Sequence, residues 1–117
     1  MSGSGSNLAA KHCIPCRGGV PPLEVEELDR LAKQIPDWRV VDGHHVEKTF
    51  LTLDFKTALE LVNRIGDVAE QEGHHPDLCF GWGSVKVTIF THKIQGLTES
   101  DFILAAKIDR LATNKHE

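Results

Sequence analysis

The 117-residue sequence lacks any apolar run approaching the roughly 18 residues that a membrane-spanning helix requires. No apolar segment follows the first methionine either, so we expect neither a secretory leader nor a membrane partner. The sequence also has no excess of positive charge, because it contains 13 Lys and Arg residues but 17 Asp and Glu residues. A nucleic-acid-binding face needs a basic surplus to bind phosphates, so we expect no direct contact with nucleic acid.

Cysteine is scarce and odd in number: the chain has Cys13, Cys16 and Cys79. An odd count favours free thiols in a reducing compartment, so we expect the protein in the cytoplasm. Cys13 and Cys16 form one C-x-x-C pair, which is half of a zinc or redox motif. The second half of such a motif is missing from the sequence.

What is present is an ordinary globular balance, with 40% hydrophobic and 26% charged residues. A chain of this length fits one domain. Residues 1–22 begin with alternating Ser and Gly and continue with several Gly, Pro and Cys, so we expect a flexible or irregular segment there. Residues 23–117 are expected to form a single α+β domain.

Hydrophobic periodicity predicts seven elements in the order helix, strand, strand, helix, strand, strand, helix. The predicted helices cover 23–35, 54–73 and 98 onward, and the predicted strands cover 38–41, 45–50, 78–82 and 85–91. Two hairpins in one small domain indicate a four-stranded antiparallel sheet with three helices packed on one face. An open sheet face or an edge strand would be available to another subunit, so we expect a homodimer or homotetramer.

The helix predicted at 54–73 has the clearest pattern. Thr52 or Asp54 is its expected N-cap, and Gly73 lies where a helix C-terminus favours glycine. A single apolar stripe within an arc of about 120° is expected to face the core. This stripe consists of Phe55, Ala58, Leu59, Val62, Ile65 and Ala69.

Histidines follow that helix directly, as Gly73-His74-His75-Pro76. A further histidine, His92, follows the last predicted strand. Pro76 fixes the local backbone and favours an extended conformation at His75. His74 and His75 are therefore expected in the loop after a helix C-terminus.

The second hairpin is expected to return His92 to this loop. If Gly83 and Ser84 occupy the centre of the turn, paired positions sum to 167 and His92 lies opposite His75. If the turn begins one residue earlier, His92 lies opposite Gly73 instead. Because directly opposed residues have Cβ atoms about 5 Å apart, either register predicts a cluster of three histidines at one end of the sheet.

Imidazoles exchange protons near neutral pH, so such a cluster suits a reaction that needs one acid and one base around a small heterocycle. Four acidic residues are near enough in the predicted fold to orient the rings: Glu70, Glu72, Asp77 and Asp101. Cys79 lies within a strand and is not placed as an obvious nucleophile.

Two other interpretations of the histidines stay open. An H-H-P triplet is common in solvated loops, and His44-His45, at a turn with no third histidine expected beside it, is interpreted as surface. Three imidazoles could also hold zinc with an open position, but neither a typical ligand spacing nor a supporting carboxylate is plain. Cys13 and Cys16 would join such a site only if the N-terminus folded over the histidines, and we expect no metal.

From about residue 28 to the end of the last helix, the sequence resembles the pterin-4a-carbinolamine dehydratases. The resemblance rests on three segments: 36–38 (PDW), 69–77 (AEQEGHHPD) and 91–101 (THKIQGLTESD). It implies the same α+β fold and a dehydratase that removes water from 4a-hydroxytetrahydropterin to give quinonoid dihydropterin. That reaction recycles the pterin of aromatic amino acid hydroxylases such as phenylalanine hydroxylase, which implies a functional link to such an enzyme. No cofactor is implied, because the pterin is the substrate.

The resemblance also implies site residues. His74, His75 and His92 match the family's three site histidines, with His74 and His92 as the acid–base pair and His75 mainly holding the pterin. The implied substrate-binding residues are Glu70, Gly73, Pro76, Phe90, Thr91 and Lys93. Some relatives carry Asp at the position of Gly73 and Trp at the position of Leu78. Some members of the family also act as non-catalytic partners of a homeodomain transcription factor, which is the alternative function.

Overall fold

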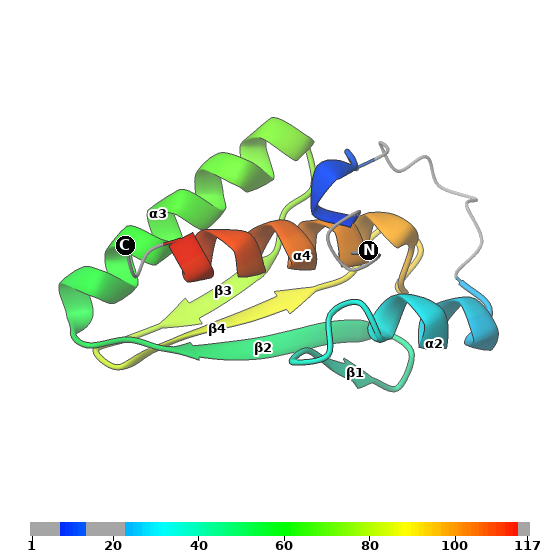
Figure 1. Cartoon of the computed structure of the whole chain (residues 1–117), viewed down its shortest axis with the longest axis horizontal. Helices are drawn as coiled ribbons and strands as arrows, with labels where there is room; N and C mark the ends of the chain where they lie inside the picture. The colour runs from blue at the N-terminus through cyan, green and yellow to red at the C-terminus, as the bar shows by residue number, and fades with distance from the viewer. Residues whose placement is uncertain (1–7, 14–22, 115–117) are drawn as a thin grey trace.

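The computed structural model describes residues 8–13 and 23–114, and it has the predicted α+β architecture. Four antiparallel strands form one sheet in the order β1-β2-β4-β3, and the helices cover one of its faces (Figure 1). The elements are α2 (Val25–Ala32), β1 (Arg39–Val41), β2 (His45–Leu51), α3 (Phe55–Glu72), β3 (Asp77–Phe80), β4 (Ser84–Ile89) and α4 (Glu99–Asn114). The predicted fold class and element order are confirmed. In the described part of the chain, no helix is long and apolar enough to cross a membrane.

Helix α3 begins and ends at residues that the sequence indicates. Asp54 is the N-cap, because its carboxylate accepts a hydrogen bond from the Thr57 backbone N–H at 2.8 Å. Thr52, the other candidate, instead donates its hydroxyl to the Trp82 carbonyl. Gly73 ends the helix in the left-handed conformation, with φ of 63°, which a residue without a Cβ adopts at little cost.

The buried face of α3 differs from the predicted stripe. Leu61, which the stripe omitted, is buried together with Ala58, Ile65 and Ala69. Phe55 and Leu59 are exposed. The helix packs on β3, β4 and α4 through the side that carries Leu61, so the buried arc is rotated away from Leu59.

The β3–β4 hairpin adopts the second of the two expected registers. Phe80 pairs with Val85 and Leu78 with Val87, so paired positions sum to 165 rather than 167. The ladder ends where Asp77 pairs with Thr88, directly after Pro76, which has no N–H to donate. The ends of the four strands differ from the predicted ranges by at most two residues.

The two faces of the sheet differ in chemistry. Toward the helices β4 presents Val85, Val87 and Ile89, which are fully buried. The other face carries a charged group, in which the Glu47 carboxylate accepts from Arg39 and lies 3.6 Å from the Lys86 ammonium. This open face is therefore suited to water rather than to an apolar partner.

The described N-terminal residues belong to the domain rather than to an irregular leader. Leu8 and Ala9 are buried in the same hydrophobic core as the sheet and α4. A domain boundary at residue 23 therefore excludes part of the core. Residues 1–7 and 14–22, which the same expectation covered, lie outside the described residues.

Candidate functional site

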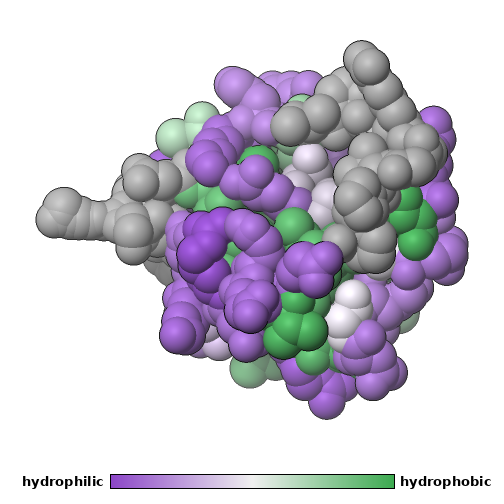
Figure 2. Space-filling model, turned by 90° about the vertical axis from the view of Figure 1, so that its right-hand side faces the viewer, coloured by the Kyte–Doolittle hydropathy of each residue, from purple (hydrophilic) through white to green (hydrophobic). Residues whose placement is uncertain are grey.

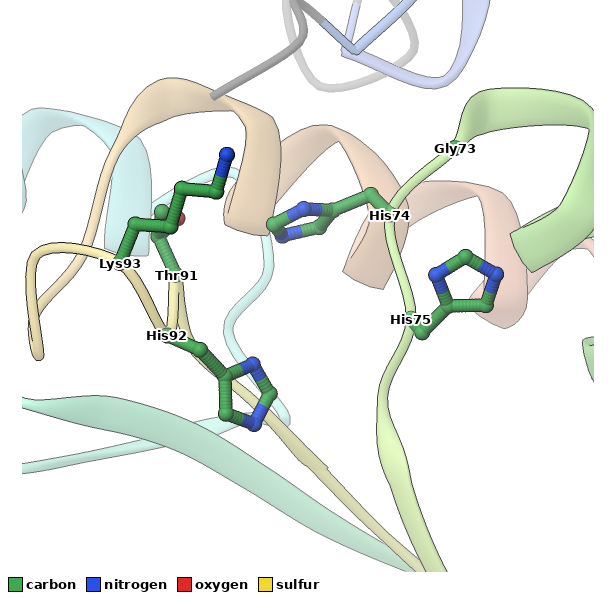
Figure 3. A pocket seen from close by; sticks show the side chains of 6 residues that line it. All are labelled: Gly73, His74, His75, Thr91, His92 and Lys93. Carbon is green, nitrogen blue, oxygen red and sulfur yellow. The ribbon is translucent and has the colours of Figure 1, made fainter. Parts of the chain in front are cut away.

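The structure brings the three predicted histidines together at one end of the sheet (Figure 3). His74 and His75 follow the end of α3, and His92 follows the end of β4. They border an open pocket of about 160 Å³. The pocket is lined by Gly73, His74, His75, Thr91, His92 and Lys93. In Figure 3 the rings of His74 and His92 point toward the space between the two loops, whereas the ring of His75 points away from it.

His74 is the most firmly held of the three rings. Its Nε2 lies 2.6 Å from a carboxylate oxygen of Asp101, and the two side chains are 12% and 0% exposed. The Asp101 carboxylate also accepts from the Thr98 backbone N–H and the Thr91 hydroxyl, each at 2.8 Å. A buried carboxylate that already accepts these two hydrogen bonds acts toward His74 as an acceptor as well, so His74 Nε2 carries the proton.

The position of Asp101 follows from the N-terminus of α4. The sequence from Thr98 to Asp101 resembles a capping box, and Asp101 reaches back to the Thr98 N–H as a capping box requires. The same carboxylate then orients His74. Asp101 is one of the four acidic residues predicted to orient the rings, and it contacts His74 because α4 begins beside the loop after α3.

His75 is held differently. Its Nε2 lies 2.7 Å from a Glu70 carboxylate oxygen, one turn back along α3, and both side chains are largely exposed. An exposed pair of this kind contributes little to stability because water competes for both partners. Glu70 does not line the pocket, so it reaches the site only through the orientation of His75.

His92 is the least constrained histidine. Its side chain is 56% exposed, and its Nε2 lies 4.0 Å from Asp77, beyond hydrogen-bonding distance. Within the ranges that the structure describes, its ring nitrogens make no hydrogen bond. Its backbone is fixed, however, because the Gln95 side-chain amide donates to the His92 carbonyl at 2.8 Å.

A row of aromatic rings backs His92. The Phe90 ring centroid lies 4.2 Å from that of His92 and 4.5 Å from that of His44. His44 in turn contacts His45, with their Nδ1 atoms 3.1 Å apart. The interpretation of His44-His45 as a plain surface pair is therefore wrong, because Phe90 connects it to the site. Neither the β1–β2 turn nor β4 gave a sequence signal for this contact between rings.

The remaining predicted binding residues divide into two groups. Gly73, Thr91 and Lys93 line the pocket. Pro76 and Phe90 lie outside its lining, although Phe90 contacts His92. In the described ranges, no three His, Cys, Asp or Glu side chains are grouped so that they could hold a metal ion.

Of the two N-terminal cysteines, only Cys13 is among the residues that the structure describes. It contacts Glu72 and Ser100, which lie next to the site in the sequence. Its thiol is half-buried, with Sγ 3.5 Å from the Ser100 carbonyl. Burial, followed by the negative charge of Glu72, raises the pKa of the Cys13 thiol to about 12. Cys16 lies outside the described residues, and Cys79 is exposed on β3.

Fold and site together define an α+β domain with a pocket lined by three imidazoles at one end of its sheet. A family model described as pterin 4 alpha carbinolamine dehydratase matches residues 21–111. The chain is 61% identical over 106 residues to a protein of Rubrobacter xylanophilus, covering 91% of this chain and 99% of the relative. It is 53% identical over 106 residues to one of Alkaliphilus metalliredigens, covering 90% and 96%. Both relatives are provisionally named pterin-4-alpha-carbinolamine dehydratases.

A solved structure is also similar. The crystal structure of a protein from Brucella melitensis, described as a transcriptional coactivator/pterin dehydratase, matches with a TM-score of 0.73 at 30% identity. The match covers 79% of this chain and 99% of that one. The chain belongs to the pterin-4a-carbinolamine dehydratase family, whose name describes a hydro-lyase.

Proposed function

We propose that this protein removes water from 4a-hydroxytetrahydropterin to give quinonoid dihydropterin. Family membership supports the substrate class. The observation that carries the proposal is His74, fixed by a buried carboxylate, facing the same pocket as His92. That arrangement supplies two imidazoles in different environments, as a reaction with one acid and one base requires.

The different environments of His74 and His92 determine which of them acts as the base and which as the acid. The C4a hydroxyl leaves as water when it receives a proton, and the N5 proton is lost as the new double bond forms. Because Nε2–H of His74 is donated to Asp101, the lone pair of Nδ1 is left to accept the N5 proton, and the carboxylate stabilises the imidazolium that results. His92, whose exposed ring makes no hydrogen bond within the described residues, protonates the leaving hydroxyl. His75 lines the same pocket, and we assign it to holding the pterin, for which its ring would turn toward the space between the loops.

This chemistry needs no cofactor, since proton transfers alone complete the dehydration. Zinc held by the histidines is the competing proposal. Elemental analysis of the purified protein separates the two. Near-stoichiometric metal that a chelator removes together with activity would replace the acid–base proposal.

The central test is an assay of 4a-hydroxytetrahydropterin dehydration with the His92→Ala variant. We expect its kcat to fall at least about tenfold, because one of the two proton-transfer groups is lost. Since His92 is exposed, its thermal melt should stay close to that of the wild type. Arg30→Ala, at an exposed residue of α2 outside the pocket, is the control and should retain activity. Full activity of His92→Ala would exclude the proposed mechanism.

The second candidate is a non-catalytic partner on the same fold. It is favoured by the description of the Brucella melitensis protein, which names a transcriptional coactivator beside the dehydratase. A partner function alone does not require a buried Asp101 bonded to His74 in an open pocket. A folded, wild-type chain that dehydrates no pterin would favour this candidate.

The product suggests where the enzyme acts. Quinonoid dihydropterin is the oxidised form that a reductase returns to tetrahydropterin, so we place the protein in pterin recycling for an aromatic amino acid hydroxylase, such as phenylalanine hydroxylase. Free Cys13 and Cys79 are consistent with a reducing compartment, and we propose the cytoplasm.

We also propose that the chain forms a homo-oligomer. Its exposed apolar side chains are concentrated where β2 leads into α3, beside the β3–β4 turn. The cluster consists of Leu51, Leu53, Phe55, Leu59 and Trp82, and a further exposed apolar residue, Val25, lies on α2. On the end of the molecule that carries α2, Figure 2 shows mostly hydrophilic side chains around a narrow apolar stripe and a smaller apolar patch. A cluster of this kind is more typical of an interface than of a surface that faces water.

A further inference from the structure

The described N-terminal residues 8–13, here called the N-terminal clamp, lie between two elements that supply the site. Figure 1 shows this blue segment between the last turn of α3 and the first turns of α4. Leu8 is buried in the core, so the clamp is anchored by packing as well as by polar contacts. Its polar contacts divide between the two helices.

On α3 the clamp is held by Glu72, whose side chain is only 6% exposed. One carboxylate oxygen accepts the Cys13 backbone N–H at 2.8 Å, and the other lies 3.0 Å from Nδ1 of His12. The Lys107 ammonium of α4 lies 3.6 Å from the same carboxylate. Glu72 therefore connects the clamp, α3 and α4 through one buried charge.

On α4 the clamp is held at three points along the helix. The Lys107 ammonium donates to the Ala9 carbonyl at 2.8 Å. Nearer the start of the helix, the Cys13 thiol bonds the Ser100 carbonyl and Lys11 pairs with Glu99. The Lys11 pair is exposed, so it is expected to add little. The partly buried contacts are the Cys13 N–H to Glu72, the Cys13 thiol to Ser100 and the Lys107 ammonium to Ala9.

These anchor points adjoin the acid–base pair. Glu72 precedes His74 by two residues, and Ser100 directly precedes Asp101. The His74–Asp101 hydrogen bond joins the same two helix ends that the clamp joins from the other side. We infer that the N-terminal clamp positions His74 against Asp101, with Glu72 as a positioning residue for the reaction proposed above. Its effect on rate rests on that proposed function, whereas its effect on the His74 ring does not.

Cys13 reports whether the clamp is docked. Docked, its thiol is shielded and has a raised pKa, so alkylation at pH 8 should be slow. Cys79 is exposed and serves as the internal reference. We expect iodoacetamide, in a Cys16→Ser background and read by peptide mass spectrometry, to label Cys13 at least about a hundredfold more slowly than Cys79.

The test compares three variants in that background. Glu72→Ala removes the acceptor of the Cys13 N–H, and we expect Cys13 labelling to accelerate about tenfold or more because the clamp opens more often. Glu72→Gln keeps the shape of the side chain and one acceptor oxygen, so its rate of Cys13 labelling should lie nearer that of the wild type. Lys11→Ala removes only the exposed pair and is the matched control, with unchanged labelling and activity.

Activity and the His74 ring are then measured on the same proteins. In Glu72→Ala, kcat should fall about tenfold with KM within about twofold, since misplaced catalytic groups weaken transition-state binding rather than substrate binding. Imidazole ¹⁵N shifts of His74 should move from one fixed tautomer toward the average of two. Partial rescue by Glu72→Gln would separate positioning from loss of fold.

Two results would overturn the inference. One is wild-type Cys13 labelled as fast as Cys79, which means that the clamp is not docked. The other is faster labelling in Glu72→Ala with kcat, KM and the His74 shifts unchanged, which means that docking does not reach the site. If the wild type dehydrates no pterin, the proposed function fails, but labelling and the ¹⁵N shifts still decide whether the clamp positions His74.

Discussion

At the scale of single residues, the Asp101 carboxylate connects the start of α4 to the site, because it caps the helix at Thr98 and accepts from His74. Both roles depend on its being an acceptor. An amide in the same place offers a donor where His74 Nε2–H needs an acceptor, so the ring would turn or change tautomer. Asp101 thus determines which nitrogen of His74 is available to a substrate.

The Asp101→Asn variant should lose most activity while remaining folded. We expect kcat to fall about a hundredfold, because His74 then presents the wrong tautomer, and stability to fall by about 1–2 kcal/mol through the weakened cap. Steady-state dehydration, thermal melting and the His74 ¹⁵N shifts measure the three effects. Glu99→Gln, which changes an exposed acid of the same helical turn, is the control. Near-normal kcat in Asp101→Asn would show that His74 does not depend on its carboxylate partner.

The candidate site was predictable from sequence as far as local patterns reach. Gly73 as a helix end and Pro76 as a strand break place His74 and His75, and a hairpin count returns His92 to them. The contact between His44 and Phe90 was not predictable, because β2 and β4 are joined through a sheet order that periodicity does not reveal.

At the scale of elements, the residues that cap helix α3 were predicted more accurately than the residues on its buried face. Asp54 acts through its own side chain on the next turn, so a local signal was enough. The buried face of α3 depends on where α4 lies, and the sequence of α3 alone does not contain that information. Leu61 is buried and Leu59 is not for this reason.

The junction of α3, α4 and the N-terminal clamp should depend on pH through Glu72. Burial alone raises the pKa of this carboxyl, but the Cys13 N–H, His12 and Lys107 together hold it below its ordinary value. A lowered folded-state pKa gives stability that is fully present above the unfolded value of about 4.3 and is lost as pH falls through the folded value. The junction is therefore expected to be intact at neutral pH and to weaken in acid.

Urea unfolding of wild type and Glu72→Gln at several pH values checks this expectation. At pH 7 the variant should be less stable by about 2 kcal/mol, because hydrogen bonds to a charged group are lost. The difference should shrink as pH falls through the lowered pKa of the folded-state Glu72 carboxyl, because the wild-type side chain then also becomes neutral. A difference that stays constant from pH 7 to pH 3 would show that the Glu72 charge does not stabilise the junction.

At the scale of the whole molecule, the arrangement of apolar and charged side chains on the surface was the feature least predictable from the sequence. Leu51 and Leu53 are 86% and 83% exposed, while the open sheet face between Arg39 and Lys86 is charged. Sequence alternation identifies two faces of a strand but does not show which one a partner contacts. An interface on the open face is therefore less favoured than one at the apolar end.

The apolar end should hold copies of the chain together. It combines the exposed Leu51 and Leu53 with a cavity of about 420 Å³ between β2, α3 and α4, which lies away from the histidines. Light scattering coupled to gel filtration should give a multiple of the 13.0 kDa chain mass. Leu53→Lys places a charge in the interface and should shift the protein toward 13.0 kDa. Val25→Lys, at an exposed apolar residue of α2 outside the apolar end, should leave the mass unchanged. A wild-type monomer, or a Leu53→Lys variant with wild-type mass at low micromolar concentration, would remove the apolar end as the interface.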